Sequence, residues 1–268
     1  MQSRLSLARA AAFAGAAVVN ARVGDIGAVR VKGDPTDVVT DTDIEAGAAI
    51  AREIVGSLPD ARFVIEETEV YELADATEGT LNDSEVWVID PLDGTTSFVH
   101  GFPCYSISVA LLREGQPVVG VVHNIPAEET FSAAEGSGAF LNDRIISCSS
   151  RTGVEEALLM TGFPYDRTVT LDRQLDVLAR FLRVPVHGIR RDGSAAIDCC
   201  RAASGQADGF WEYGLHAWDT AAGVIILRES GARVTDITGE PWSVDATGII
   251  AANPELHARM LEVIRGSE

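Results

Sequence analysis

One stretch of the chain, residues 86–96, constrains the fold most, and it reads VWVIDPLDGTT. Its first four residues are apolar without a break, which predicts a strand that is buried on both faces. The strand is expected to break at Asp90-Pro91 and to turn through Asp93-Gly94 into a short helix, capped by the hydroxyl residues that follow. Two carboxylates therefore leave the end of a buried strand three residues apart, beside the backbone N–H groups of a helix start.

These polar groups predict metal-assisted chemistry on a phosphate ester. Carboxylate oxygens suit a hard cation such as Mg²⁺, and N–H groups at a helix start suit a phosphate. Two other interpretations stay open at this point. Asp90 and Asp93 could be ordinary turn residues, because such turns are common after strands. An aspartyl-phosphate enzyme of the haloacid dehalogenase type is disfavoured, because its two aspartates stand two residues apart and these stand three apart.

The charge of the chain favours a metal site independently. The sequence has 21 basic and 40 acidic residues, which gives a formal net charge of −19. Such a surface repels nucleic acid and anionic membranes, so neither is expected as a partner. It would also repel a phosphate substrate. An acidic protein that handles phosphate esters therefore needs bound cations or a local basic patch, while most of its other acidic residues serve solubility.

Length and cysteine usage indicate a cytoplasmic globular protein. The 268 residues suffice for one large domain or for two subdomains that share a core. The four cysteines show no C-x-x-C pattern, which predicts reduced thiols. The Ala-rich start could be mistaken for an export signal, but Arg9 interrupts it and its pattern fits a helix face. No run approaches the ~20 apolar residues that a membrane span requires.

Hydrophobic patterns predict alternating helices and strands in two tightly packed halves, residues 1–145 and 146–268, without a flexible linker. The first half should be of the α+β type and should end in a run of antiparallel strands, while strands and helices alternate in the second. Helices are expected at about 3–23, 44–58, 171–181, 195–203 and 221–227, and strands at 63–65, 86–89, 105–112, 118–122, 128–134, 138–141, 157–161, 184–189 and 208–213.

Two segments carry a resemblance to a known family. Residues 87–109, WVIDPLDGTTSFVHGFPCYSISV, resemble the core signature of the inositol monophosphatase family, which also includes fructose-1,6-bisphosphatases, histidinol-phosphate phosphatases and adenosine 3′,5′-bisphosphate phosphatases. Residues 218–223, WDTAAG, resemble its second signature, W-D-x-A-A-G. The resemblance extends over about residues 5–265. It implies an α/β fold, a layered αβαβα sandwich with the site between the halves, and a homodimer.

The resemblance also implies two or three Mg²⁺ ions at each site. The ligands would be the side chains or, for the leucine, the backbone carbonyl of Glu66, Asp90, Leu92, Asp93 and Asp219, with Glu67 contributing to a third, weaker ion. The Glu66-Glu67 pair follows strand 63–65 and is similar to the family's G-E-E, with Ile65 in place of the usual glycine. On local grounds alone, the pair would be a solvated surface dipeptide and Asp219 an N-cap.

The implied mechanism is direct attack on phosphorus by a water that a metal ion activates. Glu66 and a Thr95–Asp43 pair would orient this water, although Asp43 is also expected to cap the helix that it begins. Asp93 would contact the substrate, and the backbone N–H groups of Gly94 and Thr95 would hold its phosphate. The five histidines show no metal-ligand spacing and are interpreted as structural: His100, His123, His187, His216 and His257.

Further substrate contacts implied by the resemblance are Lys32, on a flexible loop over the site, the turn Gly193-Ser194-Ala195, and Glu212. The last would accept hydrogen bonds from sugar-like hydroxyls, although locally it could be a surface residue at a strand end. The expected activity is lithium-sensitive hydrolysis of a small polyol phosphate, first of all inositol monophosphate. Fructose-1,6-bisphosphate and histidinol phosphate are alternatives. A protein of another class, a regulatory binder with residual phosphatase activity, also stays open.

Overall fold

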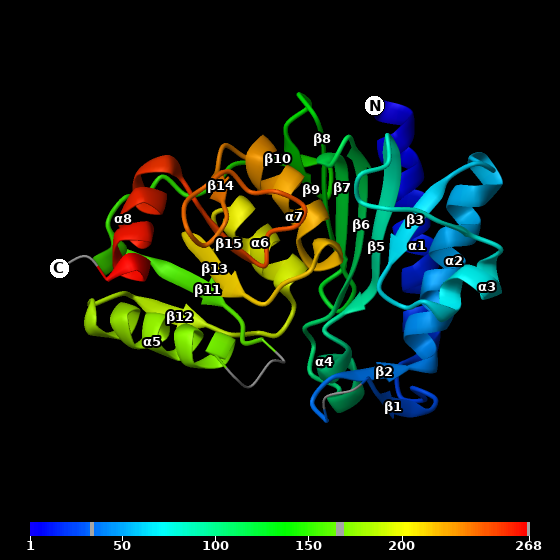
Figure 1. The fold of residues 1–268 in the computed structure, drawn as a ribbon, viewed down its shortest axis with the longest axis horizontal. Helices are drawn as coiled ribbons and strands as arrows, with labels where there is room; N and C mark the ends of the chain where they lie inside the picture. Colours follow the sequence, from blue (N-terminus) through cyan, green and yellow to red (C-terminus); the bar gives the residue numbers. More distant parts are fainter. Residues whose placement is uncertain (33–34, 165–168, 267–268) are drawn as a thin grey trace.

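Two β-sheets alternate with three layers of helices through the molecule (Figure 1). The computed structural model describes residues 1–32, 35–164 and 169–266. Two residues of the turn expected near Lys32, at positions 33 and 34, lie outside the described part. The order of layers is helix, sheet, helix, sheet, helix, which is the αβαβα sandwich expected from the sequence.

The larger sheet has eight strands in the order β10-β9-β8-β7-β6-β5-β3-β4. All neighbours are antiparallel except β3, which pairs in parallel with β5 and with β4. Its strands are β3 (Arg62–Ile65), β4 (Thr77–Glu78), β5 (Glu85–Asp93), β6 (Ser106–Arg113), β7 (Gln116–Asn124), β8 (Glu129–Ala134), β9 (Ala139–Leu141) and β10 (Arg144–Ile146).

The smaller sheet has five strands in the order β12-β11-β13-β15-β14, and it is mixed. The central pairs β12–β11 and β11–β13 are parallel, while β15 runs antiparallel to both its neighbours. Its strands are β11 (Leu158–Thr161), β12 (Gly188–Arg190), β13 (Gly209–Tyr213), β14 (Arg233–Thr235) and β15 (Gly248–Ala252). A separate hairpin joins β1 (Val29–Val31) to β2 (Val38–Thr40).

The helices cover the outer faces of both sheets and fill the space between them. Outside the larger sheet lie α1 (Gln2–Arg22) and α2 (Asp41–Ser57), between the sheets α6 (Ala195–Ala203) and α7 (Ala217–Glu229), and beyond the smaller sheet α5 (Val169–Arg183) and α8 (Pro254–Arg265). Shorter helical segments are α3 (Glu69–Ala74), α4 (Thr95–His100) and the 3₁₀ turn Val154–Glu156. Of the helices in the described ranges, none combines the length and apolarity that crossing a membrane requires.

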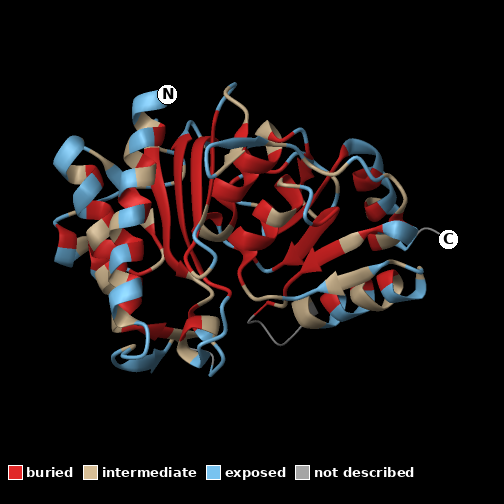
Figure 2. Cartoon of the chain, turned by 180° about the vertical axis from the view of Figure 1, so that it is seen from behind, coloured by how far each residue is buried: buried red, intermediate tan, exposed pale blue. Residues whose placement is uncertain are grey.

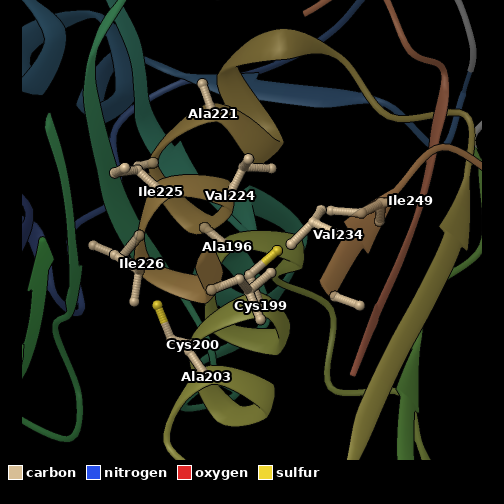
Figure 3. Packing of buried hydrophobic residues seen from close by; sticks show 14 of the residues in the cluster. Ala196, Cys199, Cys200, Ala203, Ala221, Val224, Ile225, Ile226, Val234 and Ile249 are labelled. Carbon is tan, nitrogen blue, oxygen red and sulfur yellow. The ribbon is translucent and has the colours of Figure 1, made fainter. Parts of the chain in front are cut away.

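Small residues allow the central layer to lie close to the larger sheet. A Cβ added at Gly120 of β7 would come within 2.5 Å of the backbone oxygen of Ala222 on α7, so only glycine permits this approach. Figure 3 shows Cys200 of α6 pointing toward Ile226 of α7, and Cys199 pointing toward Val234 of β14. Buried side chains are concentrated in the sheets and in this central layer (Figure 2). The division at residue 145 stays a prediction.

The structure differs from the expected elements in several places, and it adds α8, β14 and β15, which the sequence patterns did not predict. The strand β5 does not break at Asp90-Pro91 but continues to Asp93, with a register shift against β6 between Asp90 and Asp93. Pro91 is tolerated there because β3 is paired with β5 only as far as Ile89. Beyond Ile89, no residue of β3 needs a hydrogen bond from the backbone of β5, so the missing N–H of the proline costs nothing on that side. The helix α7 begins at Ala217, four residues before the expected start, and β12 is shorter than the predicted strand.

Candidate active site

The parallel pairing of β3 with β5 brings two acidic segments together. Ile65 lies opposite Ile89 in the register, and the N–H of Glu66 donates to the carbonyl of Ile89 at 3.2 Å. Because parallel strands run toward the same edge of a sheet, Glu66, which directly follows β3, lies beside Asp90 of β5. The chain therefore places acidic residues from two sequence segments at one edge.

A cavity of about 240 Å³ opens at this edge. Its lining comes from both predicted halves of the chain. It includes twelve of the predicted site residues, which are Lys32, Glu66, Asp90, Leu92, Asp93, Gly94, Thr95, Gly193, Ser194, Ala195, Glu212 and Asp219. Asp43 and Glu67 stand outside the lining. Side chains that are far apart in the sequence thus share one hollow.

The carboxylates of the cavity are crowded and poorly solvated. Burial raises the pKa of Asp90 well above its ordinary value, and the negative charges of Glu66 and Asp93 raise it further. Burial also raises the pKa of Asp219 strongly, with Asp93 adding to the effect. The pKa of Asp93 rises to about 6 by burial, although hydrogen bonds from Ser194 and Ala196 oppose the change. Such a group of carboxylates is stabilised by a cation.

Backbone and hydroxyl donors fix the orientation of these carboxylates. Asp90 Oδ1 accepts from the N–H of Leu92 at 3.0 Å. Asp93 Oδ2 accepts from Ser194 Oγ at 2.6 Å and from the N–H of Ala196 at 2.8 Å, so it joins the bulge of β5 to the start of α6. Asp219 Oδ2 accepts from the N–H of His216 at 2.7 Å. The three side chains are held by the fold rather than free to rotate.

Lys32 lies against the two glutamates of the site. Its Nζ is 2.7 Å from Glu66 Oε1 and forms a second ion pair with Glu67. Burial acts to lower the pKa of Lys32, but the two carboxylates outweigh it and hold the pKa above the ordinary value. Across residues 1–32, 35–164 and 169–266, no three His, Cys, Asp or Glu side chains already surround a common point as metal ligands. Several of the candidate oxygens contact protein donors instead.

The donor set nonetheless fits a hard divalent cation. Every candidate ligand is a carboxylate or a backbone carbonyl oxygen, and Mg²⁺ prefers oxygen ligands. Burial is the main cause of the raised pKa values of Asp90 and Asp219, and the neighbouring carboxylates add to it. Lys32 supplies only one positive charge to this group, at Glu66 and Glu67. If the Lys32 ammonium moved away, the carboxylate of Glu66 would be available to bind a cation beside Asp90.

Asp43 combines two roles that the sequence suggested separately. Its Oδ1 accepts from Thr95 Oγ1 at 2.8 Å, which is the pairing implied by the resemblance. Its Oδ2 accepts from the N–H of Thr40 at 2.9 Å, as the third residue of α2 in a capping box. Burial raises the pKa of Asp43, although the hydrogen bonds from Thr40 and Thr95 act to lower it. One buried carboxylate therefore caps the start of α2 and orients Thr95.

Three local expectations are corrected. Asp219 is not the N-cap of α7, because His216 holds that position and Asp219 is the third residue of the helix in a capping box. The short helix α4 is capped by Gly94, at φ +93°, without a capping hydroxyl. Glu212 is not a surface residue, since it is only 7% exposed, and burial raises its pKa to about 8.

The Glu66-Glu67 pair and its unusual neighbour also differ from the surface dipeptide expected locally. Glu67 is 4% exposed, and its pKa is raised to about 7 by burial and by the charge of Glu66. Ile65, which stands where the family usually has glycine, packs in the apolar core around β3 and β5 and does not line the cavity. The substitution therefore leaves the space of the cavity unchanged.

Sequence reasoning missed several cavity residues. His216, interpreted as structural, lines the cavity and stacks on Trp218 with ring centroids 4.7 Å apart. Its position two residues before Trp218, in the second family signature, could have indicated that it lies at the cavity. Arg191 and Asp198 also line the cavity. For Asp198 the signal was a carboxylate within the apolar run of α6, where a charged residue needs a reason.

Comparisons with known proteins identify the class to which this fold and site belong. The family model of the inositol monophosphatase family matches residues 1–268. An inositol-1-monophosphatase from Synechocystis sp. is 37% identical over 264 residues, covering 98% of this chain and 89% of the relative. A putative Nus factor SuhB from Neisseria meningitidis serogroup B is 37% identical over 257 residues, covering 96% of this chain and 95% of the relative.

Solved structures agree with the sequence relatives. The suhB protein of Bartonella henselae matches with a TM-score of 0.89 and 33% identity, over 99% of this chain and 100% of the other. The inositol monophosphatase of Anabaena matches with a TM-score of 0.86 and 32% identity, over 99% and 96%. The chain therefore belongs to the inositol monophosphatase family. It is a phosphoric monoester hydrolase with the layered α/β sandwich of that family.

Proposed function

We propose that the chain hydrolyses a small polyol phosphate with the help of Mg²⁺, and that inositol monophosphate is its preferred substrate. The observation that carries the proposal is the convergence of Glu66, Asp90, Asp93 and Asp219 on one cavity whose lining also includes Glu212. The four carboxylates suit metal ions, and the carboxyl group of Glu212 suits the hydroxyls of a polyol. Inositol-1-monophosphatases among the relatives support the same choice.

In the proposed mechanism, the ions would be held by Glu66, Asp90, Asp93, Asp219 and the carbonyl of Leu92, with Glu67 near a third. When bound, Mg²⁺ supplies positive charge that acidifies a water molecule and stabilises the negative charge of the leaving oxygen. The oxygen of this water would bond to phosphorus while the ester P–O bond breaks, and the leaving oxygen would take up a proton from solvent to form the alcohol. The phosphate would lie against Gly94 and Thr95 on the cavity wall.

The chain's own residues orient the attacking water. Thr95 Oγ1 donates to Asp43 Oδ1 at 2.8 Å, so the lone pairs of the Thr95 oxygen can accept a hydrogen bond from the water. Glu66 would accept the other proton as a general base. Asp93 contributes by holding Ser194 and the N–H of Ala196 in place, and this fixes the turn of residues 193–195 toward the substrate.

The test is isosteric removal of one ligand charge. Asp93→Asn and Asp219→Asn keep the volume of the side chain but remove a negative charge, so both should lower Mg²⁺-dependent release of phosphate from inositol 1-phosphate by more than about a hundredfold. Asp245→Asn, at an exposed position, is the matched control and should retain full activity. Circular dichroism checks that each variant is folded. Wild-type rates in either ligand variant would refute the assignment.

Three related features belong to the same proposal. Lithium would inhibit by replacing a weakly held Mg²⁺, the chain would form a homodimer, and it would act in the cytoplasm. Fructose-1,6-bisphosphate and histidinol phosphate are the alternative substrates, and kcat/KM values on each would rank them. The SuhB relatives, which carry the name of a Nus factor, favour a regulatory binding role as the second candidate function. Full cellular function of a Glu66→Ala variant would support that role over catalysis.

A further inference from the structure

Three ionisable side chains of the cavity form no hydrogen bond or ion pair with the described part of the protein. Asp198, Glu212 and Arg191 all line the cavity, and within the described ranges none of them makes a hydrogen bond or an ion pair. The guanidinium carbon of Arg191 lies 6.0 Å from the ring centroid of Phe163, a contact that leaves its N–H donors unused. The neighbouring acidic residues differ, because Asp90, Asp93 and Asp219 are each hydrogen-bonded to the protein.

Asp198 is the most unusual of the three. It is 1% exposed, and its Oδ1 is a buried oxygen with no hydrogen-bond partner. It lies on α6, next to Cys199 and to Cys200, which points toward α7 (Figure 3). Buried polar atoms almost always have a partner, so an exception in a cavity wall requires a reason. A ligand in the cavity would supply the missing hydrogen bond.

The chemistry of the three side chains indicates what the ligand carries. Burial raises the pKa of Glu212 to about 8, so its carboxyl group is largely protonated near neutral pH, and burial raises the pKa of Asp198 well above its ordinary value. A neutral carboxyl group donates one hydrogen bond and accepts others, and Arg191 only donates. Hydroxyl groups match this combination, since each donates one hydrogen bond and accepts two. An ammonium group would require ionised carboxylates instead.

We propose that Asp198 is a specificity-determining residue, which exchanges hydrogen bonds with a hydroxyl on the alcohol half of the substrate. The inference rests on the proposed function, because it concerns the same phosphate ester. Glu212 and Arg191 contact neighbouring hydroxyls, so the three side chains select alcohols with several hydroxyl groups. Asp198 takes no part in the reaction at phosphorus, and its loss affects binding of one class of substrate.

The test compares two substrates in Asp198→Ala, Asp198→Asn and the surface control Asp245→Asn. Inositol 1-phosphate carries several hydroxyls on its alcohol, whereas phenyl phosphate carries none. In Asp198→Ala, KM for inositol 1-phosphate should rise about five- to tenfold, the effect of one lost hydrogen bond, with kcat little changed. The kcat/KM for phenyl phosphate should stay within about twofold of wild type. Asp198→Asn should recover much of the loss, because an amide also donates and accepts.

Other outcomes would overturn the inference in distinguishable ways. Equal losses on both substrates, with a lowered melting temperature, would show that Asp198 supports the fold. An unchanged KM for inositol 1-phosphate in Asp198→Ala would show that no hydroxyl contacts it. In both cases the proposed function would stand, because the wild type remains active. A wild type that cleaves neither substrate would instead refute the proposed function, and the inference with it.

Discussion

Replacing Lys32 by glutamine should strengthen the binding of divalent cations. The ammonium lies 2.7 Å from Glu66 Oε1 and is also paired with Glu67, so an ion that uses Glu66 must first displace it. The side chains of Lys32 and Glu66 are each 24% exposed, and that of Glu67 is 5% exposed. The two ion pairs of Lys32 therefore lie between fully exposed and fully buried ion pairs. After screening by solvent, displacing the ammonium costs about 1–2 kcal/mol.

Because 1.4 kcal/mol corresponds to a tenfold change in affinity, Lys32→Gln should bind Mn²⁺ about 5- to 30-fold more tightly than wild type. Free Mn²⁺ is measured by electron paramagnetic resonance during a titration at pH 8, above the pKa of about 7 that burial gives Glu67. Arg30→Gln is the matched control, because it removes one positive charge from the same hairpin at an ion pair with Asp41. Equal or weaker Mn²⁺ binding in Lys32→Gln than in Arg30→Gln would refute the argument.

Two further predictions concern stability. Burial raises the pKa of Glu212 from 4.5 to about 8. Between these pH values its carboxyl group stays protonated in the folded chain but ionises in the unfolded chain. Glu212 therefore lowers the stability of the folded chain progressively as pH rises from about 4.5 to 8. Glu212→Gln should raise the melting temperature at pH 8 but not at pH 4.5, and an equal effect at both pH values would count against this. Gly94→Ala should lower the free energy of unfolding by about 1–3 kcal/mol, because Gly94 has φ +93° and an added Cβ would lie 2.7 Å from the oxygen of Cys104. Chemical denaturation measures it against Gly136→Ala, at φ +71° with open space, and equal losses in both would contradict the role of the close contact.

Elements with strong local signals were predicted from the sequence. The helix α6 has the bounds expected from its pattern, and the strands between 105 and 141 form the predicted antiparallel run. The strand that leads to Asp90 was expected to break at Pro91, because the pattern could not show that β3 ends beside Ile89 and leaves room for a proline. The strands β14 and β15 were missed, and β15 is placed in the sheet by its pairing with β13, which precedes it by a helix and another strand.

The candidate site was predictable where the two family signatures carry it. They placed Asp90, Asp93 and Asp219, and the structure brings these residues to one cavity. Burial could not be deduced in the same way. Glu212 looked like a strand-end surface residue, but α6 packs against its strand β13 and Gly162 lies beside its carboxyl group, so the side chain is buried. The cavity position of His216 follows from the early start of α7, which the apolar run 221–227 did not indicate.

The central claim is that acidic residues from distant segments hold divalent cations in the shared cavity. Anomalous X-ray scattering from crystals soaked in Mn²⁺ tests it most directly, because it locates ions without reference to activity. We predict at least one Mn²⁺ with carboxylate oxygens of Glu66, Asp90 and Asp219 at about 2.0–2.4 Å, and Lys32 withdrawn from Glu66. Mn²⁺ bound only elsewhere, with Lys32 still paired to Glu66 at saturating ion, would contradict the account.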